Sequence, residues 1–227
     1  MNWRRTATPC GRSGVPSSAD ASAGSRTWLL FALGWLLLPS LLVFARGGLA
    51  PRLLDAQPGL VWSEPWRCWS AAWVHWSALH LGANTVGTLL LAALGWTARV
   101  PLRAVWAWAL AWPLVAPAIT VLQPALAHYG GLSGVLHAGV AVVALWLLGQ
   151  PAAARRERLV GLALLAGLLA KLISERFWQL DLRYGGGWDI AVVPLAHAVG
   201  VASGLLAGWL CLPRSMILRK SDARRQE

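Results

Sequence analysis

Six long apolar runs constrain this chain more than any other feature of its sequence. They cover residues 28–45, 69–96, 105–122, 131–149, 159–173 and 190–212. A helix needs about 20 apolar residues to cross the hydrocarbon core of a bilayer. Only 13% of the residues are charged, against about 25% in soluble domains. The chain is therefore predicted to be an all-α polytopic membrane protein, a bundle of six transmembrane helices over residues 28–212.

The two ends of the chain differ from this apolar middle. Residues 1–27 are rich in Ser, Gly and Arg and lack apolar periodicity, which predicts a disordered tail. Residues 213–227 form a short basic tail. Because no internal repeat is evident between them, we expect one membrane domain at 28–212 and no second domain.

The positive charges are distributed unevenly. With both termini in the cytoplasm, the cytoplasmic segments hold 14 of the 20 Lys and Arg residues and a net charge of +10, whereas the outer loops have +1. This positive-inside pattern predicts a multi-pass protein of the inner (cytoplasmic) membrane with both termini cytoplasmic. It also accounts for the formal net charge of +11 without a nucleic-acid partner.

Polar residues interrupt several of the apolar runs. His80 and Asn84 are four residues apart, so they share one face of the second predicted helix. Ser133 and His137 have the same spacing in the fourth, and His197 lies near the start of the sixth. Polar groups inside membrane helices are costly and usually functional. Helices two, four and six run in the same direction, and we expect these side chains to meet near the outer surface.

Small residues indicate how Ser133 and His197 come together. They are Gly130, Gly131 and Gly134 around the serine, and Ala196, Gly200 and Gly204 around the histidine. Such residues let membrane helices pack backbone to backbone, which would bring Ser133 Oγ within reach of a ring nitrogen of His197. On the glycine-rich stretch alone, a helix contact without any chemistry remains the favoured interpretation.

This grouping supplies the roles that hydrolysis by a serine requires. Ser133 is a weak nucleophile that needs a base, and His197 can take its proton. The developing oxyanion needs donors, for which the Asn84 amide, the Ser133 N–H and His80 are candidates. No acidic residue is visibly placed to orient His197, so we expect a Ser–His dyad that uses water near the outer face.

The histidines allow other interpretations. Three of them in membrane helices would suit a metal site, but His80 and Asn84 are a poor ligand pair that no carboxylate or cysteine joins. We expect no metal and no cofactor. His75 lies near the interface and is interpreted as structural. His137 either packs on the base or is a satisfied core histidine.

Three ordered motifs extend over roughly residues 60–210. They are Glu64-Pro-Trp66-Arg67 followed by His75, His80 and Asn84, then Gly131-Leu-Ser133-Gly134, and then Ala196-His197-x-x-Gly200-x-x-x-Gly204. In these motifs the chain resembles the rhomboid intramembrane serine proteases. The resemblance implies Ser133 as nucleophile and His197 as base. It also implies an oxyanion role for His80, Asn84 and Gly131, and supporting roles for Trp66, Arg67, Gly134, Gly200 and Gly204.

One position departs from the commonest rhomboid pattern. Many rhomboids carry a tyrosine four residues after the serine, packed on the catalytic histidine, and this chain has His137 there. The string Gly-Leu-Ser-Gly-Val-Leu-His is more similar to the rhombosortase branch. That branch implies membrane-anchored substrates: exported proteins with a C-terminal Gly-Gly-type sorting tail, one membrane helix and a basic end.

Two other functions stay open. A non-catalytic rhomboid-like protein would bind or move membrane clients, although such relatives usually lack the serine or the histidine, and both are present here. A small transporter or proton pathway would use the buried histidines, but the sequence shows no inverted repeat. The protease interpretation implies cleavage in or beside a client's transmembrane helix, toward the outer (periplasmic) side of the bilayer.

Overall fold

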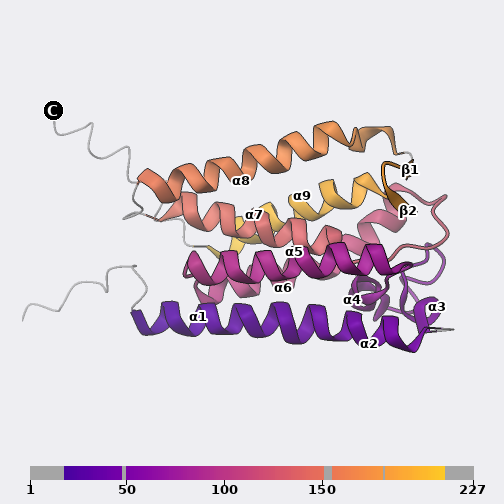
Figure 1. Ribbon diagram of the computed structural model, residues 1–227, viewed down its shortest axis with the longest axis horizontal. Coiled ribbons are helices and arrows are strands. Elements are labelled where there is room, and N and C mark those ends of the chain that lie inside the picture. The colour runs from indigo at the N-terminus through magenta and orange to yellow at the C-terminus, as the bar shows by residue number, and fades with distance from the viewer. Residues whose placement is uncertain (1–17, 48–49, 151–154, 181, 213–227) are drawn as a thin grey trace, which may run out of the picture.

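The computed structural model describes residues 18–47, 50–150, 155–180 and 182–212. Most of these residues are helical, and the long helices run side by side along the longest axis of the molecule (Figure 1). Residues 1–17 and 213–227, which belong to the two predicted tails, lie outside the described residues. The described part of the chain is thus a mostly helical bundle, as predicted, with one small β-hairpin.

The first long helical element begins earlier than predicted. It consists of α1 (Ser18–Leu30), a π-helical segment (Phe31–Leu37) and α2 (Leu38–Arg46). The prediction of a disordered tail is therefore wrong for residues 18–27. Tertiary contacts explain the difference, because a Cβ on Gly24 would overlap the Val100 carbonyl oxygen. One turn later, the fully buried Trp28 donates a hydrogen bond from Nε1 to the Leu91 carbonyl (3.0 Å).

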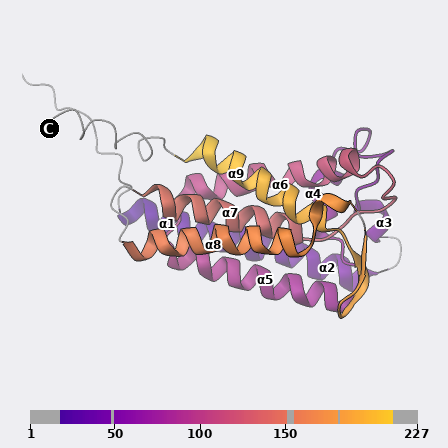
Figure 2. The same cartoon turned by 90° about the horizontal axis from the view of Figure 1, so that it is seen from above.

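Five further long helices complete the bundle. They are α5 (Ala78–Thr97), α6 (Leu102–Leu122), α7 (Ser133–Gly149), α8 (Arg155–Ser174) and α9 (Pro194–Cys211). The central helix is α7, which packs against α5, α6, α8 and α9 and has mostly buried side chains. Seen from above, the helices again follow the long axis (Figure 2). The start of α7 is therefore surrounded by protein.

Several of these helices are suited to a lipid bilayer. Four helical segments are long and apolar enough to cross one by length and composition: Ser22–Arg46, α5, α6 and α9. Large apolar side chains such as Leu90 (67% exposed) and Trp106 (59% exposed) lie on their outer faces, as expected where a surface meets lipid. These features are compatible with a multi-pass membrane protein. Six spans stay a prediction, since α7 has only 17 residues and α8 begins with charged ones.

The second predicted helix begins nine residues late, at Ala78 rather than residue 69. Ser77 caps it by accepting a hydrogen bond from the His80 N–H (3.1 Å). The residues before the cap form short turns, among them α4 (Arg67–Ser70) and a 3₁₀ turn (Ala71–Trp73). His80 therefore lies at the helix start, where its backbone N–H needs a partner outside the helix.

A hairpin replaces the first residues of the sixth predicted helix. Strand β1 (Arg183–Gly185) pairs antiparallel with β2 (Trp188–Val192), and α9 begins at Pro194 rather than residue 190. The turn contains Gly185, Gly186 and Gly187, all with positive φ (+89°, +65° and +86°). Glycine adopts this backbone region without steric cost. Two other short elements are α3 (Ala50–Leu54) and a 3₁₀ turn at Phe177–Gln179.

A buried ion pair organises the loop that precedes α5. Arg67 Nη1 lies 3.1 Å from Asp55 Oδ1, and its Nη2 lies 2.6 Å from Glu64 Oε2. Asp55 is fully buried, and its Oδ2 lies 2.6 Å from His128 Nδ1. Trp66 is half exposed beside this cluster. Asp55 thus joins the loop before α5 to the loop before α7, and Arg67 holds the Asp55 carboxylate in place.

We expect Arg67→Ala to lower the free energy of unfolding by about 3–5 kcal/mol, because it leaves the Asp55 carboxylate buried without its main partner. Thermal unfolding in detergent micelles would measure the change. The exposed Arg103 offers a matched control, and Arg103→Ala should stay within about 0.5 kcal/mol of the wild type. Equal stability of the two variants would contradict this role of Arg67.

Candidate active site

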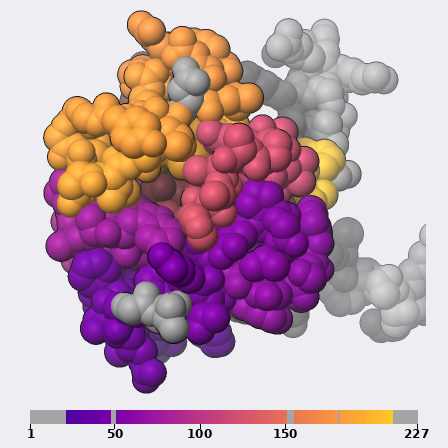
Figure 3. Space-filling view, turned by 90° about the vertical axis from the view of Figure 1, so that its right-hand side faces the viewer, coloured from indigo at the N-terminus to yellow at the C-terminus, as the bar shows by residue number. Residues whose placement is uncertain are grey.

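Three helix starts bring the predicted site residues to one end of the bundle. His80 is the third residue of α5, Ser133 the first of α7 and His197 the fourth of α9. All three border one cavity of about 650 Å³, together with Asn84 and His137. Figure 3 shows this end of the molecule, where the orange hairpin segment borders a hollow. The polar side chains that the sequence singles out therefore do meet.

The contact between α7 and α9 is as close as glycine allows. A Cβ on Gly200 would overlap the Gly134 carbonyl, and a Cβ on Gly204 would overlap the Ala138 carbonyl. Both contacts are with backbone atoms, which have little freedom to move. Small residues thus bring the two helices together beside the serine and the histidine, as predicted.

Gly130 and Gly131 take no part in that contact, contrary to the prediction. Gly131 has a φ of +126°, and a Cβ there would lie 2.7 Å from the His80 ring. Its N–H donates a hydrogen bond to the Ala71 carbonyl (2.9 Å), and Gly130 packs against Val74. These glycines therefore let the chain turn into α7 against the segment that precedes α5, which places the start of α7 beside His80.

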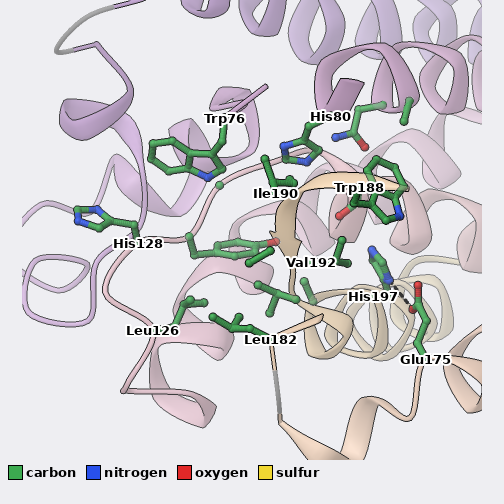
Figure 4. Close-up of a pocket in the computed structure, with 18 of the residues that line it drawn as sticks. Trp76, His80, Leu126, His128, Glu175, Leu182, Trp188, Ile190, Val192 and His197 are labelled. Atoms are coloured by element: carbon green, nitrogen blue, oxygen red, sulfur yellow. Dashed lines mark hydrogen bonds and ion pairs between the residues drawn. The ribbon is translucent and has the colours of Figure 1, made fainter. Parts of the chain in front are cut away.

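Two side chains hold the His197 ring. Its Nδ1 lies 2.6 Å from Glu175 Oε2, the contact dashed in Figure 4. The ring also stacks on His137, with centroids 4.3 Å apart and planes inclined by 16°. His137 Nδ1 in turn donates to the Ser133 carbonyl at 2.7 Å. The His137 ring thus packs on His197 and is also hydrogen-bonded within the bundle, so these contacts fit both interpretations of His137.

The expectation that no acidic residue is placed beside His197 is wrong, because Glu175 lies against its ring. Glu175 follows α8 directly, 22 residues before His197 in the sequence. Its other oxygen, Oε1, accepts a hydrogen bond from Lys171 Nζ (2.7 Å). No sequence motif identifies Glu175. The sequence shows only that it is an acidic residue in a predicted outer loop, which does not indicate a contact with His197. Glu175 contacts His197 only because the end of α8 lies close to the start of α9 in the folded protein.

The bond to Glu175 decides which nitrogen of His197 is free. A carboxylate accepts hydrogen bonds, so Nδ1 carries the hydrogen and Nε2 of the neutral ring keeps its lone pair. Ser133 and His197 border the same cavity, but within the described residues no hydrogen bond joins them. The predicted hydrogen bond between Ser133 Oγ and a ring nitrogen of His197 is therefore not formed among the described residues. Catalytic hydrogen bonds are often long before substrate binds.

Unpaired polar atoms gather around the same cavity. Among the described residues, Asn84 Nδ2, His80 Nδ1 and the Tyr129 hydroxyl are buried without a hydrogen-bond partner, and all three residues border the cavity. An unsatisfied buried polar group costs about 1–3 kcal/mol, which a bound polar ligand can recover. The Ser133 N–H, the first of α7, also has no partner within its helix. Tyr129 was not singled out from the sequence.

The hairpin forms one side of the cavity. Trp188, Ile190 and Val192 of β2 border it (Figure 4). Ser77 Oγ donates a hydrogen bond to Asp189 Oδ1 (2.6 Å), which ties the hairpin to the start of α5. The polar groups of the site therefore face a largely apolar wall that is held in place by a side-chain hydrogen bond.

His75 takes a structural position, as interpreted from the sequence. It is buried, its Nδ1 lies 3.2 Å from the Trp73 carbonyl oxygen, and its ring lies 4.8 Å from that of His80. Among the residues that the structure describes, no three His, Cys, Asp or Glu side chains are grouped so as to hold a metal ion. The absence of a metal and of a cofactor stays a prediction.

Comparison of the chain with models of known protein families found no match. Comparison with curated proteins also found no similar sequence. Support for a function therefore comes from the geometry of this cavity and from the three sequence motifs.

Proposed function

We propose that this protein is an intramembrane serine endopeptidase of the rhomboid type, with Ser133 as nucleophile and His197 as base. One observation carries the proposal. A serine at the start of α7 and a histidine near the start of α9 border one cavity, across a glycine contact between their helices. A carboxylate holds Nδ1 of that histidine and leaves Nε2 available for a proton. The order of the motifs along the chain also supports it.

In this mechanism, Ser133 Oγ attacks the carbonyl carbon of the scissile peptide bond while His197 Nε2 takes the hydroxyl proton. The negative charge that develops on the carbonyl oxygen requires donors. The Asn84 amide, unpaired among the described residues, and the Ser133 N–H at the start of α7 are suited to that role, and the His80 ring supports it.

The remaining steps return the enzyme to its starting state. His197 gives its proton to the leaving amine nitrogen, and the C–N bond breaks to leave an ester on Ser133. Water then attacks the ester carbonyl, and its proton passes to His197. Collapse of the second intermediate releases the acid product and returns the proton to Ser133 Oγ.

The proposed location is the inner (cytoplasmic) membrane, with both termini in the cytoplasm and the cavity toward the periplasm. The surplus of basic residues in the segments assigned to the cytoplasm supports this orientation. The proposed substrates are exported proteins held in the bilayer by one C-terminal helix, after a Gly-Gly-type motif. The histidine at position 137 supports this rhombosortase-like choice.

A second candidate function is binding of membrane clients without cleavage. The observation that favours it is the missing hydrogen bond between the serine and the histidine in the described structure. The cavity and the unpaired donors would suit a bound client segment as well as a reacting one.

Labelling by a fluorophosphonate probe in isolated membranes separates these two functions, because the probe reacts only with an activated serine. We expect labelling of the wild type and none of Ser133→Ala or His197→Ala. Ser203, buried in α9, provides a matched control, and Ser203→Ala should label like the wild type. Absence of labelling in folded wild-type protein would reject the protease in favour of client binding.

A further inference from the structure

We propose that Glu175 is a positioning residue for His197, so that the site works as a Ser–His–Glu triad and not as a dyad. This inference rests on the proposed protease function and names a further member of its machinery. The carboxylate would hold the imidazole by Nδ1, with Nε2 turned toward the serine, and would stabilise the imidazolium that forms during attack.

The geometry around Glu175 leaves each carboxylate oxygen one partner. Oε2 lies 2.6 Å from His197 Nδ1, and Oε1 lies 2.7 Å from Lys171 Nζ. Lys171 occupies the last turn of α8, four residues earlier, so the two side chains lie on the same helical face. The carboxylate is thus clamped between a cation and the imidazole, and both hydrogen bonds are charge-assisted and short.

The backbone fixes this position as well. Glu175 N donates to the Lys171 carbonyl (3.0 Å), which continues the helical bonding of α8 by one residue. Arg176 then adopts a φ of +48°, in the left-handed region, and ends the helix. Glu175 therefore lies at the end of the helical backbone of α8, immediately before the chain turns, and its side chain contacts the start of α9.

The charge state suits the role. Burial alone would raise the pKa of Glu175, but the hydrogen bond and charge of His197, followed by those of Lys171, outweigh it and lower the pKa to about 2. The folded-state pKa lies below the ordinary value. Glu175 is therefore ionised at neutral pH. The stability that its ionised carboxylate contributes to the fold is present above the ordinary pKa of a glutamate and is lost as the pH falls toward about 2. At neutral pH the imidazole faces a carboxylate and not a carboxylic acid.

A purely structural link between α8 and α9 is the alternative explanation of the same contact. Two features favour a role in the reaction. The His197 ring is held on one face by His137, at 4.3 Å, and on one edge by Glu175, so that both orientation and tautomer are defined. The remaining nitrogen, Nε2, is the one that the proposed mechanism uses.

The test measures turnover of a single-helix reporter client in liposomes by the wild type and Glu175→Gln. The amide keeps the size of the side chain, but it removes the charge and can donate to Nδ1, which would place the hydrogen on Nε2. Loss of the acid in a serine triad costs up to about 10⁴-fold in kcat. Because Glu175 is partly exposed, we expect a loss of about a hundredfold in kcat with KM changed less than about threefold. Formate should restore part of the rate to Glu175→Ala.

A matched control lies at the other end of the same helix. Glu157 is in the first turn of α8 and exposed, and Glu157→Gln should keep wild-type kcat and KM. If Glu175→Gln turns over like the wild type while Ser133→Ala is inactive, the triad is rejected and the protease stands. The triad would also be rejected if the loss of turnover in Glu175→Gln were fully explained by a smaller fraction of folded protein and formate did not restore activity to Glu175→Ala. Wild-type cleavage by Ser133→Ala would instead reject the protease itself.

Discussion

Ser133→Ala should reduce cleavage of a client by at least about a thousandfold while leaving the fold intact. The Ser133 hydroxyl makes no hydrogen bond within the described residues, so the substitution removes the nucleophile without removing a structural contact. The measurement uses purified protein in liposomes. Its reporter carries a Gly-Gly motif, one membrane helix and a basic end, and the product is identified by mass spectrometry.

The size of the loss distinguishes the nucleophile from the other groups of the site. Asn84→Ala removes one proposed oxyanion donor and should cost about 10²–10³-fold, less than loss of the serine. Thermal unfolding midpoints of the two variants would show whether either effect is structural. Cleavage by Ser133→Ala at the wild-type rate, at the same bond, would refute Ser133 as nucleophile.

Gly200→Ala should destabilise the protein by more than about 3 kcal/mol and abolish cleavage. The added Cβ would overlap the Gly134 carbonyl. Since that group belongs to the backbone of the central helix α7, α7 and α9 must separate to make room. Their separation would move the His197 ring away from the start of α7. Thermal unfolding in detergent and the reporter assay measure the two effects.

Gly167 provides the matched control for this substitution. It lies on the exposed face of α8, and a Cβ there would meet nothing within 4 Å. Gly167→Ala should therefore stabilise the helix by about 0.5–1 kcal/mol, since alanine loses less backbone entropy than glycine. Full activity and stability of Gly200→Ala would show that the close contact of α7 and α9 is not required.

Much of the candidate site could be predicted because its residues follow local rules. The spacing of His80 from Asn84 and of Ser133 from His137 is one helical turn, and helical periodicity alone places each pair on one face. The glycines of α9 also behaved as predicted, since Gly200 and Gly204 both contact the backbone of α7. A spacing of four residues has the same meaning in any straight helix, whatever surrounds it.

Element boundaries were less predictable because tertiary contacts decide them. Residues 18–27 look like a polar tail, yet the close contact of Gly24 with the Val100 carbonyl holds them in a helix. Residues 69–77 and 190–192 are as apolar as the helices they precede. The Ser77 cap ends the first of these segments, and pairing with β1 takes the second into a strand.

The sequence by itself determined the class of the protein, because long apolar runs with few charges are stable only as helices packed in a bundle or bilayer. It also determined which polar residues interrupt those helices. Only the tertiary structure decided that Glu175 binds His197, that Gly131 packs on His80, and that a hairpin lines the cavity. These contacts join residues from different elements. Their partners are set by how helices and loops approach one another, and a local pattern carries no information about that approach.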